Sequence, residues 1–247
     1  MKFTIITAVY NRSKTIGAAL DSVTQQTYAN VEHVVIDGAS TDGTLEVIEA
    51  HRHEGMVLIS EPDRGIYDAL NKGIENASGD IIGIMHSDDF YSHQNVLAKA
   101  ATCFAQTSAD AVYGDLDYVS SSDTDRIRRR WSSGDFDRRK LRRGWMPPHP
   151  TLFVRRAVFE QFGVYDTSYQ IAADYDAMLR WFWCNNIDPV YIPEVLVKMR
   201  VGGESNRSLE RIWRKSVEDY RALRSNGVGG ILALTSKNLR KVPQFFG

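Results

Sequence analysis

The 247-residue chain lacks the features that mark several common classes of protein. Its only two cysteines, Cys103 and Cys184, fit no metal or redox spacing, so we expect reduced thiols and a cytoplasmic setting. No apolar run approaches the ~18 residues that a membrane-spanning helix needs. The opening segment carries no signal-peptide cleavage pattern. Any membrane contact, for example at the inner face of the plasma membrane, is therefore expected to be peripheral.

An excess of charge of one sign is also missing. Lys and Arg together number 30, and Asp and Glu number 31, so the formal net charge is −1. A nucleic-acid module remains an alternative because arginines are frequent over residues 126–143. Four aspartates in or beside that stretch offset its positive charge and argue against this alternative: Asp123, Asp125, Asp135 and Asp137. We therefore expect no nucleic-acid partner.

Three sequence signatures of other enzymes are absent. No G-x-G-x-x-G follows the first apolar run and no G-x-x-x-x-G-K-[ST] occurs, which argues against a dinucleotide oxidoreductase and a P-loop kinase. There is no G-x-S-x-G, the nucleophile turn of the α/β-hydrolases.

The chain does have a regular alternation of strands and helices in its first half. Four apolar runs predict buried strands: Phe3–Val9, Val31–Ile36, Met56–Ser60 and Ile81–Met85. Three segments between them predict helices: Ser13–Gln26, Thr41–His51 and Ile66–Asn76. This order predicts an α/β fold with a Rossmann-like, mostly parallel sheet flanked by helices.

The second half is less regular. Helices are predicted at Asn95–Ala105, Arg155–Gln161 and Asp174–Asn185, and strands at Ala111–Val119, Pro189–Ile192 and Val195–Arg200. We expect one domain over residues 1–206, divided into a first half (1–110) and a second half (111–206). A basic, amphipathic helical extension is expected over residues 207–247.

Polar residues follow each predicted strand of the first half, at the edge where such sheets bind ligands. The four groups are Tyr10–Arg12, Asp37–Thr44, Glu61–Gly65 and His86–Asp89. Asp88 and Asp89 are adjacent carboxylates after a buried strand, and a divalent cation would remove their repulsion and desolvation cost. Mg²⁺ or Mn²⁺ would suit these oxygen ligands and would neutralise a diphosphate leaving group. Asp37 could accept hydrogen bonds from a ribose hydroxyl or a base.

Together these segments resemble the family 2 inverting glycosyltransferases with the GT-A fold. The segments that carry the resemblance, from residue 1 to about residue 205, are TAVYNR, IDGASTDGT, EPDRGIYDALNKGIENASGD, IIGIMHSDD, VYGD, PPHPTLFVRR, FGVYD and AADYDAMLRW. Bacterial enzymes that build surface polysaccharides or glycolipids look most similar. The resemblance implies a nucleoside-diphosphate sugar as donor and a saccharide or lipid-linked saccharide as acceptor.

The resemblance also implies roles for individual residues. Asp89 would bind the metal, Asp174 would be the catalytic base, and His149 and Trp145 could contact the acceptor. The donor pocket would be formed by Tyr10, Asp37, Asp63, Asn71, Lys72 and Asp88. Many relatives have Glu-Asp where this chain has Ala173-Asp174, so the base lacks its usual acidic neighbour. A sugar nucleotidyltransferase and a catalytically weak nucleotide-sugar-binding protein are the alternatives.

The extension from Arg207 to Gly247 is the remaining feature. It holds nine Lys and Arg against three acids, with apolar residues interleaved. Such a segment can lie on an anionic membrane surface. It can equally pack its apolar side on the catalytic domain, and the sequence leaves both interpretations open.

Overall fold

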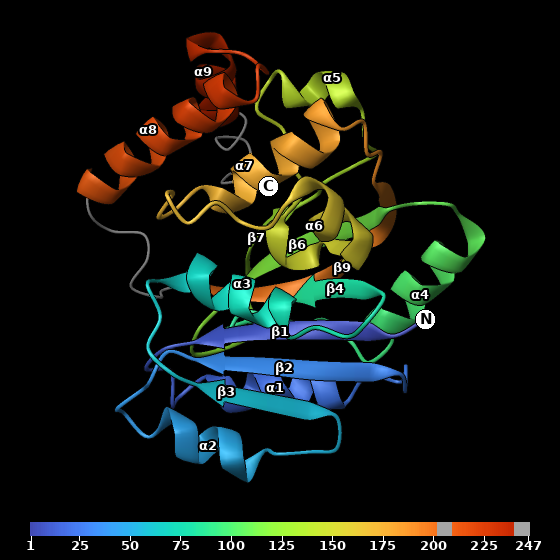
Figure 1. The fold of residues 1–247 in the computed structure, drawn as a ribbon, viewed down its shortest axis with the longest axis vertical. Coiled ribbons are helices and arrows are strands. Elements are labelled where there is room, and N and C mark those ends of the chain that lie inside the picture. The colour runs from blue at the N-terminus through green and yellow to red at the C-terminus, as the bar shows by residue number, and fades with distance from the viewer. Residues whose placement is uncertain (202–208, 240–247) are drawn as a thin grey trace.

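The computed structural model describes residues 1–201 and 209–239 (Figure 1). The first half alternates strands and helices as the sequence predicts. Its elements are β1 (Phe3–Val9), α1 (Ile16–Thr24), β2 (Val31–Asp37), α2 (Thr44–Ala50), β3 (Met56–Ser60), α3 (Ile66–Glu75) and β4 (Ile81–Ile84). These four strands are parallel and lie in the order β3-β2-β1-β4. Their carboxyl ends therefore meet at one edge of the sheet.

The second half extends this sheet with mostly antiparallel pairings. Its elements are β5 (Phe90–Tyr91), α4 (Val96–Gln106), β6 (Ala111–Ser120), β7 (Ile127–Trp131), α5 (Arg138–Leu141), η1 (His149–Thr151), β8 (Phe153–Arg155), α6 (Arg156–Phe162), α7 (Ala173–Leu179), η2 (Arg180–Cys184) and β9 (Val190–Val201). The strand order continues from β4 as β8-β6-β9-β5, and β7 pairs with β6. The mixed sheet agrees with the predicted α/β fold.

Two predictions for the second half were wrong in detail. The strands expected at Pro189–Ile192 and Val195–Arg200 form the single strand β9. Proline lacks the N–H that a ladder needs, so Pro193 suggested a break. A register shift opposite Gly114 accommodates it instead. The helix expected over Asp174–Asn185 changes from α-helical to π-helical at Arg180.

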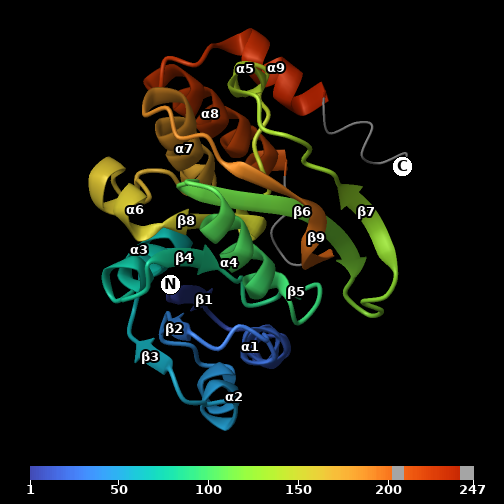
Figure 2. The same ribbon diagram turned by 90° about the vertical axis from the view of Figure 1, so that its right-hand side faces the viewer.

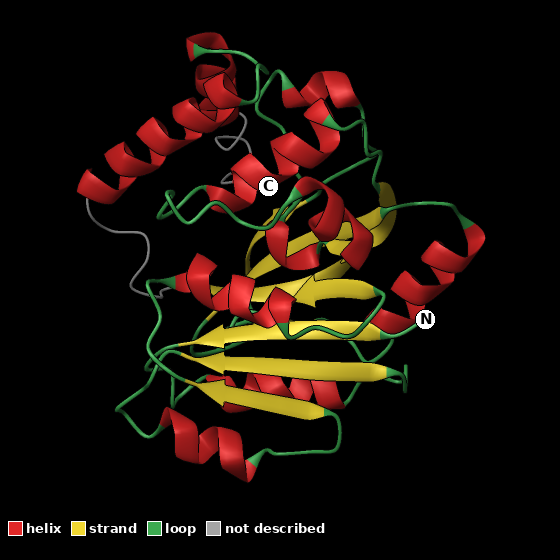
Figure 3. Ribbon diagram, viewed as in Figure 1, coloured by secondary structure: helices red, strands yellow, loops and turns green. Residues whose placement is uncertain are grey.

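Helices cover both faces of the sheet, because alternate residues of each buried strand point to opposite sides. In β1, Ile5 packs with residues of α1 and α4, whereas Ile6 packs with residues of α3. Figure 2 shows α3 and α6 on one side of the sheet and α1 and α4 on the other. Figure 3 shows the resulting layers of helix, strand and helix. The two hydrophobic layers hold the strand ends in place.

The described part of the C-terminal extension forms α8 (Leu209–Ser225) and α9 (Ile231–Leu239), which pack over α7. The Glu218 carboxylate accepts the backbone N–H groups of Gln170, Ile171 and Ala172 at 2.8–3.1 Å, just before α7 begins. The boundary expected at residues 206 and 207 lies outside the described residues. None of the helices in the described ranges has the length and apolarity to cross a membrane.

A buried ion pair connects the two C-terminal helices. Lys237 Nζ lies 2.8 Å from Asp219 Oδ1, and both side chains are almost completely buried. The same ammonium group lies 3.0 Å from the centroid of the Tyr175 ring on α7. This arrangement joins α8, α9 and α7 through one charged cluster.

Replacement of Asp219 by Ala is expected to lower the free energy of unfolding by about 3–5 kcal/mol, because the Lys237 charge stays buried without its carboxylate partner. Urea unfolding followed by circular dichroism measures this loss. The matched control is Arg224→Ala, an exposed position on the same helix. The double variant Asp219→Leu/Lys237→Met is expected to recover most of the loss. Equal stabilities of Asp219→Ala and Arg224→Ala would contradict the structural role of the pair.

Candidate functional site

The carboxyl ends of the parallel strands bring together most of the predicted donor-site residues. Asp37 ends β2, directly beside Val9 of β1 and Ser60 of β3 in the strand register. The Asp37 carboxylate is fully buried, and it accepts hydrogen bonds from Ser60 Oγ at 2.7 Å and from the Ser40 N–H at 3.1 Å. These two bonds fix its orientation at the sheet edge.

Gly38 allows the next strand ends to approach closely. A Cβ atom at this position would lie 2.4 Å from Asp63 Oδ2 and 3.4 Å from Tyr10 Cδ2. The Asp63 carboxylate also accepts the Gly65 N–H at 2.8 Å, which closes the turn before α3. The Tyr10 ring stays 58% exposed and forms an open wall next to this carboxylate. Tyr10 and Asp63 thus lie beside Gly38, directly after the buried Asp37.

Lys72 and Asn71 on α3 are both bonded within the protein. Lys72 Nζ lies 2.6 Å from Glu61 Oε1 and donates to the Pro62 carbonyl at 2.9 Å, so it holds the loop after β3. The Asn71 side chain donates to the Tyr165 carbonyl at 2.8 Å and accepts the Tyr165 N–H at 3.0 Å. In this structure both residues fix loops that border the site.

Asp89 is the most unusual carboxylate of the site. Its side chain is fully buried, and neither carboxylate oxygen has a hydrogen-bond partner in the part of the chain that the structure describes. Burial, followed by the negative charge of Asp88, raises the pKa of Asp89 well above its usual value. Arg200 Nη1 donates to the Asp88 carbonyl at 2.6 Å and holds this turn against β9. A buried carboxylate without partners is costly, and a cation would compensate for it.

These residues fit a divalent cation only if other groups complete its shell. Within residues 1–201 and 209–239, no group of three or more His, Cys, Asp or Glu side chains is placed to hold a metal ion. Two adjacent carboxylates are nevertheless the kind of oxygen ligands that Mg²⁺ and Mn²⁺ use together with water and phosphate oxygens. The donor set therefore fits a cation that binds with a diphosphate.

Asp174 lies in the first turn of α7, on the other side of His86. Tyr67 Oη donates to Asp174 Oδ1 at 3.2 Å and to the Ile171 carbonyl at 2.7 Å. Burial raises the pKa of Asp174. The electrostatic influence of three side chains and a hydrogen bond from a backbone N–H lower it by more, so the pKa lies below the usual value; these groups are His149, Lys215, Lys237 and the N–H of Tyr175. The carboxylate is therefore ionised at neutral pH.

Two histidines lie near Asp174. The rings of His86 and His149 are 5.9 Å apart, and His149 Nε2 is 2.8 Å from Tyr165 Oη. Burial lowers the pKa of His149 to about 4, against a raising effect of Asp174. Burial also lowers the pKa of His86, and the nearby carboxylates of Asp88 and Asp174 oppose this effect. Both predicted carboxylates thus lie near the His86 ring, and His149 lies near the predicted base.

Trp145, the other predicted acceptor contact, does not reach this space. Its side chain is 8% exposed, packs against Tyr113 and Phe136, and donates its indole N–H to the Ser133 carbonyl at 3.1 Å. A core tryptophan offers no ring face to a sugar, so Trp145 does not belong to the acceptor site.

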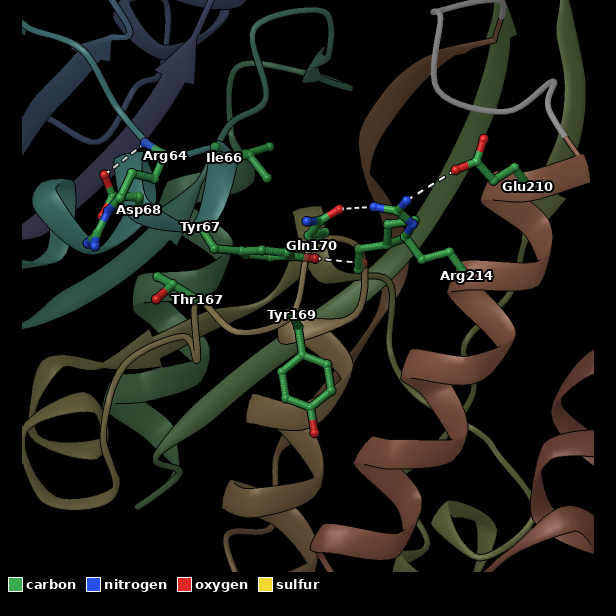
Figure 4. A pocket seen from close by; sticks show the side chains of 11 residues that line it. Arg64, Ile66, Tyr67, Asp68, Thr167, Tyr169, Gln170, Glu210 and Arg214 are labelled. Carbon is green, nitrogen blue, oxygen red and sulfur yellow. Dashed lines mark hydrogen bonds and ion pairs between the residues drawn. The ribbon is translucent and has the colours of Figure 1, made fainter.

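The structure adds residues that sequence reasoning missed. Tyr67 follows Gly65 and Ile66 in the segment RGIYDALNKG, so its place in that segment was a usable signal. Glu218, by contrast, is 46 residues from Ala172, and nothing in the local sequence links the two. A cleft of about 500 Å³ also opens beside Tyr67, between the start of α3 and α8 (Figure 4).

Comparison with known proteins gives consistent relatives. The chain is 30% identical over 219 residues to a PGL/p-HBAD biosynthesis glycosyltransferase of Mycobacterium bovis, an alignment that covers 86% of this chain and 82% of the relative. It is 29% identical over 165 residues to the glycosyltransferase AglE of Haloferax volcanii, which covers 64% of this chain and 54% of AglE.

Solved structures share the fold. S. aureus TarS in complex with UDP-GlcNAc superposes with a TM-score of 0.73 at 20% identity, covering 92% of this chain and 66% of the TarS chain. The mannosyltransferase PcManGT of Pyrobaculum calidifontis, in complex with GDP-Man and Mn²⁺, superposes with a TM-score of 0.66 at 20% identity over 98% of this chain and 74% of that chain. These similarities confirm the predicted GT-A fold.

The model of the family described as glycosyl transferase family 2 matches residues 4–163. This match covers the strand ends with Tyr10, Asp37, Asp63 and the Asp88–Asp89 pair, and it agrees with the resemblance in the sequence. The chain belongs to glycosyl transferase family 2.

Proposed function

We propose that this glycosyltransferase moves one sugar from a nucleoside-diphosphate sugar to an acceptor hydroxyl in a single displacement with inversion. The observation that carries the proposal is the pairing of an ionised, part-exposed Asp174 with the buried, unpartnered Asp89 across one site. Family membership favours this activity over a sugar nucleotidyltransferase. The intact carboxylates favour it over a binding protein without activity.

In this account the sheet edge binds the donor. Asp63 offers carboxylate oxygens to ribose or base, Tyr10 offers its exposed ring, and the buried Asp37 holds Ser40 and Ser60 at the same edge. Asp88 and Asp89 would hold Mg²⁺ or Mn²⁺, which when bound neutralises negative charge on the diphosphate leaving group. The complexes of TarS with UDP-GlcNAc and of PcManGT with GDP-Man and Mn²⁺ support this assignment.

Asp174 acts as the general base. Its carboxylate accepts the proton of the acceptor hydroxyl while the acceptor oxygen bonds to the anomeric carbon and the bond from that carbon to the diphosphate breaks. Tyr67 holds the carboxylate by donating a hydrogen bond at 3.2 Å. Burial lowers the pKa of His86 and of His149, so both rings are neutral near pH 7 and do not repel the cation.

Removal of the Asp89 charge tests the metal site. Mn²⁺ added together with a nucleoside diphosphate is expected to raise the melting temperature of the wild-type protein, and Asp89→Asn is expected to abolish this shift and to lower transfer at least about a hundredfold. In EDTA the variant is expected to be as stable as the wild type or more stable, because a buried unpaired charge is gone. Differential scanning calorimetry measures the Mn²⁺ shift and the stability in EDTA, and release of nucleoside diphosphate measures transfer. The exposed Glu75→Gln is the control. An unchanged Mn²⁺ shift in Asp89→Asn would rule out this ligand.

Replacement of the proposed base tests the chemistry separately from binding. Asp174→Asn is expected to lower kcat by about 10²–10⁴-fold and to leave donor affinity within about twofold, because the amide cannot accept the proton. Stopped assays of nucleoside diphosphate release and calorimetric donor titration measure the two quantities, with the exposed Asp188→Asn as control. Since the pKa of Asp174 is lowered, the acidic limb of its pH–kcat profile is expected below the range of an ordinary aspartate. Wild-type turnover by Asp174→Asn would assign the base elsewhere.

We further propose a peripheral membrane contact through α8 and a saccharide or lipid-linked saccharide as acceptor. Trp213, Val217 and Tyr220 follow a helical spacing and are 68%, 45% and 36% exposed, although α8 packs on α7 through its other face. Such an apolar stripe beside the exposed Arg224 suits an anionic membrane surface. The name of the mycobacterial relative, which refers to PGL/p-HBAD biosynthesis, supports an acceptor of this kind.

Vesicle binding tests the stripe. The wild-type chain is expected to sediment with vesicles of phosphatidylcholine and phosphatidylglycerol, and Trp213→Ser/Val217→Ser is expected to bind at least about tenfold more weakly because two apolar side chains are lost. The control is Val57→Ser, which replaces an exposed apolar side chain on β3. Equal binding by the double variant and the wild type, or no binding by either, would refute this contact.

A further inference from the structure

The cleft beside Tyr67 is not used by the donor and metal account. It holds about 500 Å³ and is lined from three segments: the start of α3, the loop before α7, and α8 (Figure 4). Neither Asp37 and Asp63 nor the Asp88–Asp89 pair lines it. Its size falls in the range of pockets that bind small ligands.

The cleft ends one side chain short of the proposed base. Tyr67 and Ile171 line it, and Tyr67 Oη shares its single hydrogen between the Ile171 carbonyl at 2.7 Å and Asp174 Oδ1 at 3.2 Å. A molecule in the cleft would therefore have to extend its reacting hydroxyl past Tyr67 to reach the Asp174 carboxylate. This location suits the acceptor better than the donor, whose contacts lie at the strand ends.

The charges of the cleft balance. Two arginines and two acids line it, so they sum to zero. Arg64 Nη2 lies 2.8 Å from Asp68 Oδ1, and Arg214 Nη2 lies 3.1 Å from Glu210 Oε1. Because each arginine already has a carboxylate beside it, the cleft has no excess positive charge for a phosphate or a carboxylate ligand.

The remaining groups suit a ligand rich in hydroxyls. The Arg214 guanidinium also donates to the Gln170 side-chain carbonyl, which leaves the Gln170 amide nitrogen as a further donor at the cleft wall. Guanidinium, amide and carboxylate groups together can donate to and accept from neighbouring hydroxyls.

The wall of the cleft is held in advance by α8. Glu218 accepts the N–H groups of Gln170, Ile171 and Ala172, so the loop that carries Gln170 is fixed to the helix that carries Arg214. A fixed wall lowers the entropy cost of binding.

We infer that this cleft is the acceptor subsite and that it takes a neutral saccharide, with Arg214 and Gln170 as recognition residues. This inference rests on the proposed function, because it assigns the acceptor to the side of Asp174.

The test uses the full chain and the nucleotide-sugar that it turns over best in a panel of UDP- and GDP-sugars. Release of nucleoside diphosphate is measured without acceptor, with octyl glycosides of neutral hexoses, and with the octyl glucuronide as a matched anionic acceptor. Neutral glycosides are expected to stimulate release and the glucuronide is not. Arg214→Ala is expected to raise the half-saturating concentration of the neutral glycoside at least about tenfold, as loss of one hydrogen bond to a charged group implies.

Two controls separate the outcomes. The basal release without acceptor is measured for every variant to check donor turnover by itself, and Arg224→Ala, on the exposed side of the same helix, is expected to behave as wild type in both assays. Gln170→Ala, an exposed position, gives a second variant in case Arg214→Ala is unstable, with a smaller rise expected. Equal half-saturation in Arg214→Ala, Gln170→Ala and Arg224→Ala, or preference for the glucuronide, would overturn the inference while basal release still supports the proposed function. No release from any donor would instead defeat the proposed function.

Discussion

The parallel register of β1 to β4 is the constraint on which the rest of the site depends. Val9 pairs with Asp37, and Asp37 pairs with Ser60, so these strands end at the same level of the sheet. The polar residues that follow the strands therefore meet at one edge, although they are far apart in the sequence. The apolar layers on both faces leave this edge as the place where polar side chains can gather. The gathering of polar side chains at this edge thus follows from packing, before any particular ligand is considered.

The C-terminal helices add a second constraint, which acts on the acceptor side. Glu218 on α8 holds the segment that leads into α7, and Tyr67 on α3 holds Asp174 at the start of α7. The Asp219–Lys237 pair fixes α9 against the same helices. The proposed base is thus positioned by α3 of the first half and by α8 of the extension. The described extension is therefore part of the framework of the site as well as a candidate membrane surface.

Much of the first half could be predicted from the sequence, because β1, β2 and β4 are almost fully buried apolar runs and the polar motifs follow the strands directly. β1 and β3 have the predicted bounds, and the polar groups after all four strands lie where the doubly wound pattern requires. The second half could not be predicted as well. Antiparallel pairing, the bulge around Pro193 and the strand β7 within a charge-rich stretch depend on partners far along the chain.

The same distinction applies to the site. Local motifs pointed to Asp37, Asp88, Asp89 and Asp174, whereas Trp145 could not be distinguished from a sugar-stacking residue without its core neighbours. His149 was open between a structural and a functional role, and its place between Tyr165 and Asp174 supports both. Glu218 and Arg214 reach the site only through tertiary packing, so no spacing rule could have selected them.

The central claim is that Asp174 takes the acceptor proton during one direct displacement at the anomeric carbon. The most direct test is the anomeric configuration of the first product, followed by proton NMR during turnover of an α-linked nucleotide-sugar. The account predicts that the β-linked product appears first and alone. An α-linked first product would contradict it.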